Sequence, residues 1–306
     1  MSTRITTGMT QRNILADLNR VSERLTRTQE KVASNREITR PSDDPFNASR
    51  ALALRTSMEG TQQYQRNIQD AQSWQETAEV ALSDITGAVA LVQELAVRGA
   101  SDTNDPAARL AIADEVDELI ERIKQNANVT HRGRHVFSGT ATDTPPYAET
   151  PDPYVPAADA YNGSTAAIAR QIGPGVPLDI GVLGSDFLGG GPAAADGKLL
   201  HVLRDVSRHL RADDGAALRA DIPRLEANLD TVLGVRSQNG ARQNRLEAAL
   251  GRLAQVEEST LKQLSNTEDV DIAKALIDFS SQQAAYQAAL RAGASIVQVS
   301  LMDFLR

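Results

Sequence analysis

Two adjacent aspartates, Asp43 and Asp44, are the strongest candidates for chemistry in this sequence. They lie in the stretch RPSDDP, between Pro41 and Pro45, and neighbouring carboxylates can hold a metal ion or exchange a proton with a substrate. The same residues can also separate two helices, because aspartate accepts hydrogen bonds at a helix start and proline suits the first helical position. The first interpretation predicts an enzyme, and the second predicts a structural element.

The helix-junction interpretation accounts for every residue of this motif. Asp44-Pro45 predicts a helix start, and Pro41 predicts the end of the preceding helix, since the residue before a proline is pushed toward extended geometry. Asp43 adds negative charge near a helix N-terminus, where it is favourable. The Asp-Pro pair at 105–106 repeats this pattern. We therefore expect a junction without catalytic function, made of Arg40, Pro41, Ser42, Asp43, Asp44 and Pro45.

Other polar residues form no pattern that indicates catalysis or a metal ion. His131 and His135 are four residues apart, but Gly133 between them argues against a shared helical face, and two ligands alone are a weak zinc signal. His201 and His209 are eight apart, and we expect them to be solvated or half-buried. The glycine-rich stretches lack the strand, helix and lysine of a phosphate-binding loop. These observations predict a protein without enzyme activity, cofactor or metal.

Composition limits the classes of function further. Of the 306 residues, 41% are hydrophobic but only 4% are aromatic, so burial must depend on Ala, Leu, Ile and Val, as in helical bundles. The formal net charge of −8 disfavours nucleic-acid binding, because phosphate contacts require positive charge. The absence of cysteine excludes disulfides and thiolate metal sites. The N-terminal stretch lacks the apolar core of a signal peptide, and no apolar run approaches the ~20 residues of a membrane span.

Both ends of the chain carry apolar residues at alternating steps of three and four, which predicts a coiled-coil seam at each end. Gln283 and Gly293 interrupt the second seam. Residues 1–40 carry an excess of basic side chains and residues 268–306 an excess of acidic ones, so we expect the two helices to pair. The second seam begins at Ile272. The expected assembly interface consists of Ile14, Leu18, Val21, Leu25 and Val32 in the first seam and of Leu276, Phe279, Tyr286, Leu290, Val297, Leu301 and Phe304 in the second.

Longer helices are predicted between these seams. Residues 46–98 form one predicted helix, whose clearest apolar stripe runs from Leu82 to Ala96. Asp105 predicts the start of the next helix, and Pro223 predicts the start or a kink of a later one.

The segment of residues 139–196 differs in kind, since it is rich in Pro, Thr and Gly. Alternating apolar residues from Val176 to Val182 predict a short strand, with residues 168–172 as its partner. An enzyme could carry a carbohydrate or metal site here, but the acids are scattered through loop-like sequence and we expect them to be solvated. They are Asp143, Glu149, Asp152, Asp159, Asp179 and Asp186.

Together these patterns predict a mainly α fold: a long antiparallel helical bundle with paired N- and C-terminal coiled-coil helices and a small β-rich insert. The predicted parts are terminal segments at 1–40 and 266–306, a helical body at 41–138 and 197–265, and an outer insert at 139–196. A signalling coiled coil is a competing interpretation, but the sequence offers neither a membrane span nor a catalytic domain for it.

Five stretches of the sequence resemble the flagellin family. The most characteristic is ITRPSDDPFNASRALALR, and the RPSDDP form within it is most similar to the family's hook–filament junction proteins. Its neighbour SNREITRP departs from the family, since Glu37 stands where many members have a basic residue. The other stretches are RITTGMTQRNILADLNRVSERLTRTQEKVAS, HRGRHVFSGTATDTPPY, RSQNGARQNRLEAAL and LSNTEDVDIAKALIDFSSQQAAYQAALRAGASIVQVSLMDFL.

The resemblance implies a structural subunit of the extracellular bacterial flagellum that joins hook to filament and self-assembles through its terminal helices. It implies export through the flagellar type III apparatus, with an export chaperone holding the C-terminal segment beforehand. The implied partners are copies of the same chain, the other hook–filament junction protein and flagellin, without nucleic acid or membrane insertion. The alternative within the family is flagellin itself, the filament subunit.

Overall fold

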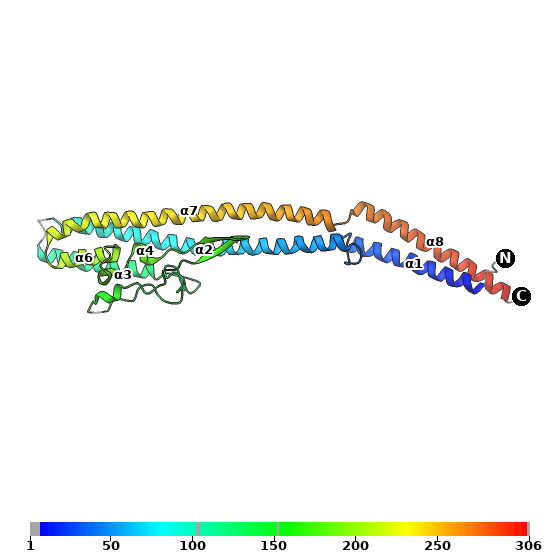
Figure 1. Ribbon diagram of the computed structural model, residues 1–306, viewed down its shortest axis with the longest axis horizontal. Helices are drawn as coiled ribbons and strands as arrows, with labels where there is room; N and C mark the ends of the chain where they lie inside the picture. The colour runs from blue at the N-terminus through cyan, green and yellow to red at the C-terminus, as the bar shows by residue number, and fades with distance from the viewer. Residues whose placement is uncertain (1–6, 102–104, 152, 305–306) are drawn as a thin grey trace. The chain divides into compact units, whose positions relative to one another are not determined.

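A computed structural model of the chain describes residues 7–101, 105–151 and 153–304, with their side chains except at positions 7, 8, 10, 11 and 295–304. The protein is mainly α, with long helices and a few short antiparallel strands, as the sequence predicts. In chain order the elements are α1 (Thr7–Ser34), α2 (Pro45–Gly99), α3 (Pro106–Ala127), β1 (Thr130–His131), β2 (Arg134–His135), η1 (Pro156–Asp159), β3 (Ala169–Gly173), β4 (Val176–Asp179), α4 (Gly184–Phe187), α5 (Gly191–Ala194), α6 (Leu199–Arg211), α7 (Gly215–Glu268) and α8 (Ile272–Phe304) (Figure 1).

The chain divides into two compact units, each of which is described by itself. The terminal unit contains residues 1–60 and 256–306, and the central unit contains residues 61–255. The two long helices α2 and α7 each contribute one end to either unit. The division into terminal segments, body and outer insert stays a prediction.

In the terminal unit, α1 and α8 pack along each other in opposite chain directions (Figure 1). α1 ends because Asn35 adopts a left-handed backbone conformation, φ 57°, which asparagine tolerates better than most residues. The segments that follow α1 and α7 then meet. The N–H of Val270 donates to the C=O of Asn35 over 3.3 Å, and the N–H of Glu37 donates to the C=O of Glu268 over 2.7 Å. The predicted pairing of the terminal helices is confirmed.

In the central unit, α2, α3, α6 and α7 bury their apolar faces in one core. The stripes predicted from sequence for the second and third helices both lie in it, because residues three and four apart share one helical face. Buried members of these stripes are Leu82, Ile85, Val89, Val92 and Ala96 on α2, and Ile112, Val116, Leu119 and Ile123 on α3.

Aspartates define two helix starts in the central unit. Asp105 Oδ1 accepts a hydrogen bond of 2.8 Å from the third residue of α3, so the N-cap predicted there is confirmed. Asp214 Oδ1 accepts one of 2.9 Å from the N–H of Ala217 in the first turn of α7. Of the two alternatives predicted for Pro223, the helix start is wrong, because α7 already begins at Gly215 and continues through the proline, and the kink stays a prediction.

The central unit carries two short hairpins, β1–β2 before the predicted insert and β3–β4 within it. The predicted strand pair is confirmed, with Arg170 opposite Leu178, but β4 ends at Asp179. Beyond that end Ile180 and Val182 stay buried in the core, and the N–H of Ile180 still donates to the C=O of Ile168 over 2.9 Å. Alternating burial therefore continues further than the strand that it predicts.

Backbone carbonyls accept hydrogen bonds that join the insert to the helices and order its own turns. The Nδ2 of Asn67 on α2 donates to a carbonyl of β3, and the Nη1 of Arg242 on α7 donates to the carbonyl of Gly181 after β4. Two buried or half-buried tyrosine hydroxyls do the same, and burial raises the pKa of one of them, Tyr161, to about 12. The bonds are Asn67 to Gln171 at 3.0 Å, Arg242 to Gly181 at 3.0 Å, Tyr147 to Gly189 at 2.8 Å and Tyr161 to Phe137 at 2.9 Å.

One acid of the insert is buried, in contrast to the prediction that all six are solvated. Asp159 at the end of η1 has no exposed surface, because Lys124 of α3 and Arg204 of α6 enclose its carboxylate. The Nζ of Lys124 lies 2.9 Å from its Oδ1, and the Nε of Arg204 lies 2.8 Å from its Oδ2. Tyr154 closes this cluster, donating its hydroxyl to Asp159 and stacking on the Arg204 guanidinium. Asp152 lies outside the described residues.

Among the described residues, one helix, α2, contains a window long and apolar enough to cross a membrane by length and composition alone. Of this window 44% is buried inside the protein, where its apolar side chains build the core of the central unit. The same composition is required of a core helix in a soluble protein, so this window is weak evidence for membrane insertion.

Candidate assembly surface on the terminal helices

The connector between α1 and α2 consists of residues 35–44, and the RPSDDP motif forms its end and the first residue of α2. The helix start predicted at Asp44-Pro45 is confirmed, but the prediction that Pro41 ends the preceding helix is wrong, because α1 already ends at Ser34. Asp44 Oδ1 accepts hydrogen bonds from the N–H groups of Phe46 at 3.1 Å and Asn47 at 3.0 Å, which caps α2. The Asn47 N–H and side-chain amide lower the pKa of Asp44 below its ordinary value. The carboxylate therefore acts as an anionic cap.

Asp43, two residues before α2, also fixes the conformation of the connector. Its Oδ2 accepts the N–H of Arg40 at 2.9 Å and the hydroxyl of Thr39 at 3.1 Å. The hydrogen bond from the Arg40 N–H is the main reason that the pKa of Asp43 lies below its ordinary value. The Arg40 side chain returns to α1, where its Nη2 lies 3.1 Å from both carboxylate oxygens of Glu30. These contacts fix the conformation of the connector and attach it to α1.

A buried acid at the end of α7 joins the connector to α2. The side chain of Glu268 is 8% exposed, and its carboxylate pairs with the guanidinium of Arg55. Arg36 of the connector approaches the same carboxylate, with its Nε 3.7 Å from Oε1. Sequence reasoning missed this cluster because its members are up to 213 residues apart and no spacing rule links them.

The predicted seam of α1 is on the face that packs against α8. All five predicted residues are half-buried, and Thr28 completes the row between two of them. This periodicity was correctly inferred because each step places an apolar side chain on one face. The residues are Ile14, Leu18, Val21, Leu25 and Val32.

The predicted seam of α8 is partly wrong as a contact with α1. Phe279 and Tyr286 are half-buried against α1, but Leu276 is 49% exposed and Leu290 is 44% exposed. The side chains of Val297, Leu301 and Phe304 lie outside the described part of the chain. The less exposed row of α8 is Ala275, Phe279, Gln282, Tyr286, Ala289 and Gly293.

This error has a physical cause. The row on α8 that faces α1 alternates large residues with small or polar ones, such as Ala275, Gln282 and Ala289, which give a weak apolar signal. Leu276 and Leu290 lie one residue further along the helix, about 100° around its axis, and give the stronger signal. The predicted seam therefore contains residues from two neighbouring faces of one helix.

The glycine at position 293 is explained by the packing of α8 against α1. A β-carbon at this position would lie 3.3 Å from the Cγ2 of Ile14, closer than most real contacts of this kind. The absence of a side chain at Gly293 therefore lets α8 approach the N-terminal part of α1 closely. What looks like an interruption of the seam in sequence is a point of close helix contact.

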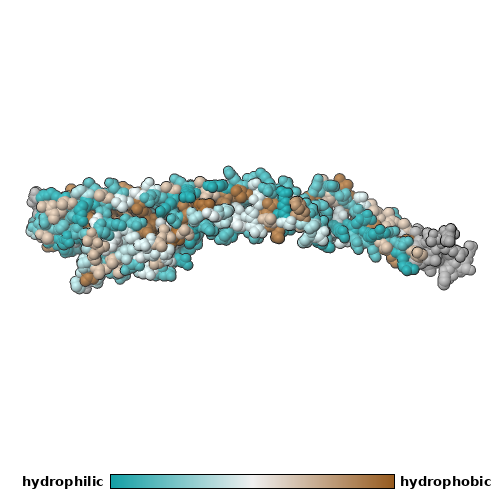
Figure 2. Space-filling model, in the orientation of Figure 1, coloured by the Kyte–Doolittle hydropathy of each residue, from teal (hydrophilic) through white to brown (hydrophobic). Residues whose placement is uncertain are grey.

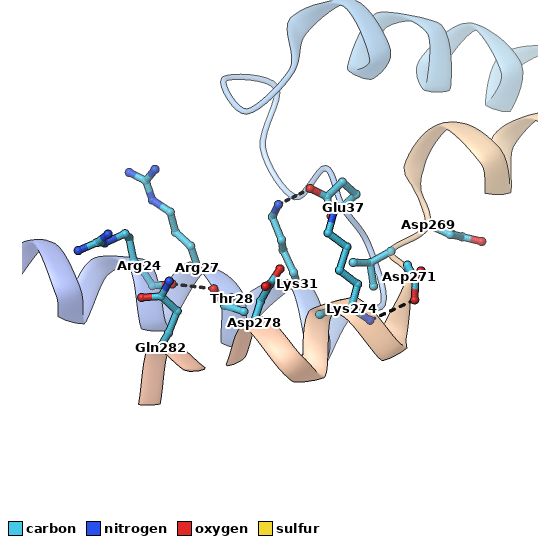
Figure 3. A pocket seen from close by; sticks show the side chains of 12 residues that line it. Arg24, Arg27, Thr28, Lys31, Glu37, Asp269, Asp271, Lys274, Asp278 and Gln282 are labelled. Atoms are coloured by element: carbon cyan, nitrogen blue, oxygen red, sulfur yellow. Dashed lines mark hydrogen bonds and ion pairs between the residues drawn. The ribbon is translucent and has the colours of Figure 1, made fainter. Parts of the chain in front are cut away.

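A groove with a volume of about 440 Å³ runs between α1 and α8 beside the connector. Figure 3 shows basic side chains of α1, among them Arg24 and Arg27, on one side and Asp278 of α8 on the other. Lys31 also lines the groove, but it pairs with Glu37 of the connector. The groove can thus receive charged side chains of either sign.

Exposed apolar side chains complete the candidate surface. Ile272, Leu276, Ile277 and Leu290 of α8 are all between 44% and 68% exposed, and so is Leu261 near the end of α7 at 47%. On the face seen in Figure 2, further apolar atoms gather along α2 and α7. Such side chains on a helix whose other face already packs against α1 are typical of a surface that a further helix covers.

The remaining polar candidates form no metal site within the described residues, where no three or more His, Cys, Asp or Glu side chains converge. His131 and His135 lie on the β1–β2 hairpin, and His131 Nδ1 is 3.1 Å from the hydroxyl of Thr77. His201 and His209 are half-buried on α6, as predicted, beside Asp205 and Asp221 respectively.

Two sequence families match this chain. The bacterial flagellin N-terminal helical region matches residues 5–142, and the bacterial flagellin C-terminal helical region matches residues 223–305. The matches include α1, the connector, α2, α3 and α8, and they therefore contain the whole candidate surface.

Individual proteins are similar over nearly the whole length. Flagellar hook-associated protein 3 of Escherichia coli (strain K12) is 26% identical over 294 residues, which are 90% of this chain and 90% of that protein. Flagellin of Bacillus subtilis (strain 168) is 29% identical over 312 residues, which are 95% of this chain and 97% of that protein.

Solved structures show a similar fold. Flagellar hook-associated protein 3 from Legionella pneumophila has a TM-score of 0.58 at 14% identity, covering 70% of this chain and 98% of that one. FlgL of Bacillus cereus has a TM-score of 0.57 at 20% identity, covering 70% of this chain and 99% of that one.

Proposed function

Because this chain belongs to the flagellin family, whose two helical regions match its two ends, we propose that it is the structural subunit that joins the flagellar hook to the filament. It belongs to the extracellular bacterial flagellum, and its role is structural rather than catalytic. Similarity to hook-associated protein 3 over 90% of both chains supports the junction in particular.

The observation that supports an assembly function is that α8 has two neighbouring apolar faces, of which only one is covered. One face packs against α1, and the neighbouring face leaves Leu276 and Leu290 exposed. The heptad step of seven residues that links Leu290 to Val297 and Phe304 continues this second row in the sequence. An exposed apolar row beside an occupied one suits a helix that contacts its own partner and another copy of the chain.

We propose that the row facing α1 and this second row together are the assembly interface. Ile14, Leu18, Val21, Leu25 and Val32 would then hold α8 in place, and Leu276 and Leu290 would contact a neighbouring copy. The groove beside the connector offers Arg27 and Asp278 for charged contacts that fix the orientation of that copy.

We propose as partners the other junction protein on the hook side and flagellin on the filament side. Before assembly, a chaperone of the export apparatus would cover the C-terminal segment, whose exposed leucines would otherwise associate too early. These partners follow from the family and from the apolar surface, and co-purification from the host tests each of them.

A second candidate function is flagellin itself, the filament subunit. The 29% identity to Bacillus subtilis flagellin over 95% of this chain favours it, because that similarity is as extensive as the similarity to hook-associated protein 3. Both functions use the same terminal helices, so the two proposals differ in whether the subunit lies at the hook–filament junction or along the filament.

Deletion of the gene in its host distinguishes them, with electron microscopy of the hooks and an assay of flagellin in the medium. If the chain is a junction protein, we expect bare hooks together with abundant monomeric flagellin outside the cell, because the exported filament subunits have no junction on which to assemble. Bare hooks without flagellin in the medium identify the chain as the filament subunit. Intact filaments would contradict both proposals.

A further inference from the structure

The stretch RSQNGARQNRLEAAL carries a polar cluster that the assembly surface does not use. Within it, Arg236 and Asn239 of α7 face α2 in the central unit, where they meet Gln75 and Glu79. Asn239 and Gln75 have no exposed surface at all, although the interface around them is apolar. A buried polar layer of this kind destabilises a helix pair unless it has a specific partner.

The contacts across this layer are specific in position. The Nε and Nη2 of Arg236 lie 2.9 and 2.7 Å from one carboxylate oxygen of Glu79. The Nδ2 of Asn239 lies 3.2 Å from the backbone oxygen of Gln75 and 3.5 Å from the other oxygen of Glu79. Two consecutive turns of α7 thus hold two consecutive turns of α2.

The layer is not optimised for stability. Both atoms of the Gln75 amide and the Oδ1 of Asn239 are buried without a hydrogen-bond partner among the described residues. Such groups weaken a folded protein unless internal water reaches them. Two apolar side chains of similar size would fill the same space at lower free energy.

Among the apolar side chains around the layer, the alanines of α2 define the register of the two helices less sharply than large residues such as Trp74 do. Much of the buried face of α2 is alanine, and a row of alanines offers similar spaces after a shift of seven residues. The heptad-equivalent positions on either side of Glu79 hold Gln72 and Thr86, neither of which offers Arg236 a carboxylate. The buried alanines are Ala71, Ala78, Ala81, Ala88 and Ala96.

We propose that Arg236 and Asn239 of α7, with Gln75 and Glu79 of α2, are a register key for this helix pair. The key makes one axial alignment of α7 on α2 more favourable than its neighbours. It does so because a shift of seven residues places Gln72 or Thr86 in the position of Glu79, which takes the carboxylate away from Arg236 and Asn239. Buried polar residues select a single register in coiled coils by the same mechanism.

The experiment measures the register directly. Since the chain has no cysteine, replacing the exposed Ser83 of α2 and Ser237 of α7 by cysteine gives two unique spin-label sites. Pulsed electron paramagnetic resonance on the otherwise native full chain should give one narrow distance. The double variant Glu79→Ala/Asn239→Leu should give an additional or strongly broadened distance, since a shift of seven residues moves the labels by about 10 Å along the helix.

The control is Glu226→Ala, which removes an exposed contact between the same two helices, Gln93 to Glu226 at 3.2 Å. It should leave the single distance unchanged. A folded double variant that keeps the single native distance would overturn the proposal, whatever its melting temperature, and make the layer an ordinary packing contact. If the double variant does not fold, Glu79→Gln alone carries the same test, because it removes the carboxylate charge that Arg236 meets in the native register and should broaden the distance.

Discussion

Glu268, almost fully buried at the end of α7, is paired with Arg55 of α2, which lies 213 residues earlier in the chain. Arg36 of the connector approaches the same carboxylate, and the backbone of Glu268 accepts the N–H of Glu37. One residue thus holds the connector, α2 and α7 of the terminal unit together, which makes it the first target for mutation.

Glu268→Gln should lower the free energy of unfolding of the terminal unit by about 1–3 kcal/mol, because it leaves Arg55 with a neutral partner at a buried site. Glu258→Gln is the matched control, since Glu258 pairs only with the exposed Lys262 one turn away and should change stability by less than about 0.5 kcal/mol. Urea titration followed by circular dichroism measures both. Equal effects of the two variants would show that the buried pair has no special role.

Leu290→Asp should leave the isolated chain folded but block its incorporation into the flagellum. Leu290 is exposed in the single chain, and its substitution would bury an unpaired charge only when a neighbouring copy covers it. Ser281→Asp, on the opposite side of α8, is the control and should assemble normally. The measurement is motility together with the amount of each variant in purified flagella. Normal incorporation of the Leu290 variant would exclude this face from the interface.

Gly293→Leu should weaken the pairing of α1 and α8, because its side chain would enter the space next to Ile14. The expected loss is about 1–3 kcal/mol, as for other overpacked helix contacts. Gly251→Leu on α7 is the control: no atom lies within 4 Å of a β-carbon there, so the better helix propensity should stabilise by up to about 1 kcal/mol. Hydrogen exchange of the α1 and α8 amides reports on the pairing, and unchanged protection in the Gly293 variant would refute the close contact.

The cluster around Asp159 predicts a pH dependence. Burial alone would raise the pKa of Asp159, but the hydrogen bonds and charges of Arg204 and then Lys124 outweigh it and hold the pKa below its ordinary value of 3.8. A carboxylate with a lowered pKa stabilises the fold above the unfolded value, and this contribution disappears as the pH falls below about 3.8 through the folded value.

Asp159→Asn should therefore destabilise the central unit by about 3–5 kcal/mol at pH 7, where it leaves two buried cations short of a partner. The difference from the native chain should shrink as the pH falls below about 4. Asp143→Asn, an exposed acid of the same insert, should show neither effect. Thermal unfolding at a series of pH values measures all three chains. A difference that stays constant with pH would show that Asp159 is not ionised in the folded protein.

Much of the fold is readable from the sequence because helical periodicity and aspartate caps act locally. The stripe from Leu82 to Ala96, the cap at Asp105 and the junction at Asp44 all depend on residues within a few turns. A helix start at Pro223 is wrong because a proline in a helix need not start it once tertiary packing holds the turns on both sides.

The candidate site is less predictable because its contacts are not local. Leu276 and Leu290 dominate the apolar pattern of α8, yet the smaller Ala275 and Ala289 face α1. Only the partner helix decides which of two neighbouring faces is occupied. Burial of Asp159 likewise depends on cations from α3 and α6, and nothing in the loop-like sequence around it signals their approach.

The segment of residues 139–196 is attached to α2 and α7 through its backbone carbonyls at Gln171 and Gly181, which accept hydrogen bonds from Asn67 and Arg242. A carbonyl is present whatever side chain a residue carries, so these two attachments do not depend on the residue types at the accepting positions. The side chains at these two positions can therefore diverge while the attachment persists. A subunit built in this way can vary the sequence of this segment without altering the hydrogen bonds that join it to the two long helices.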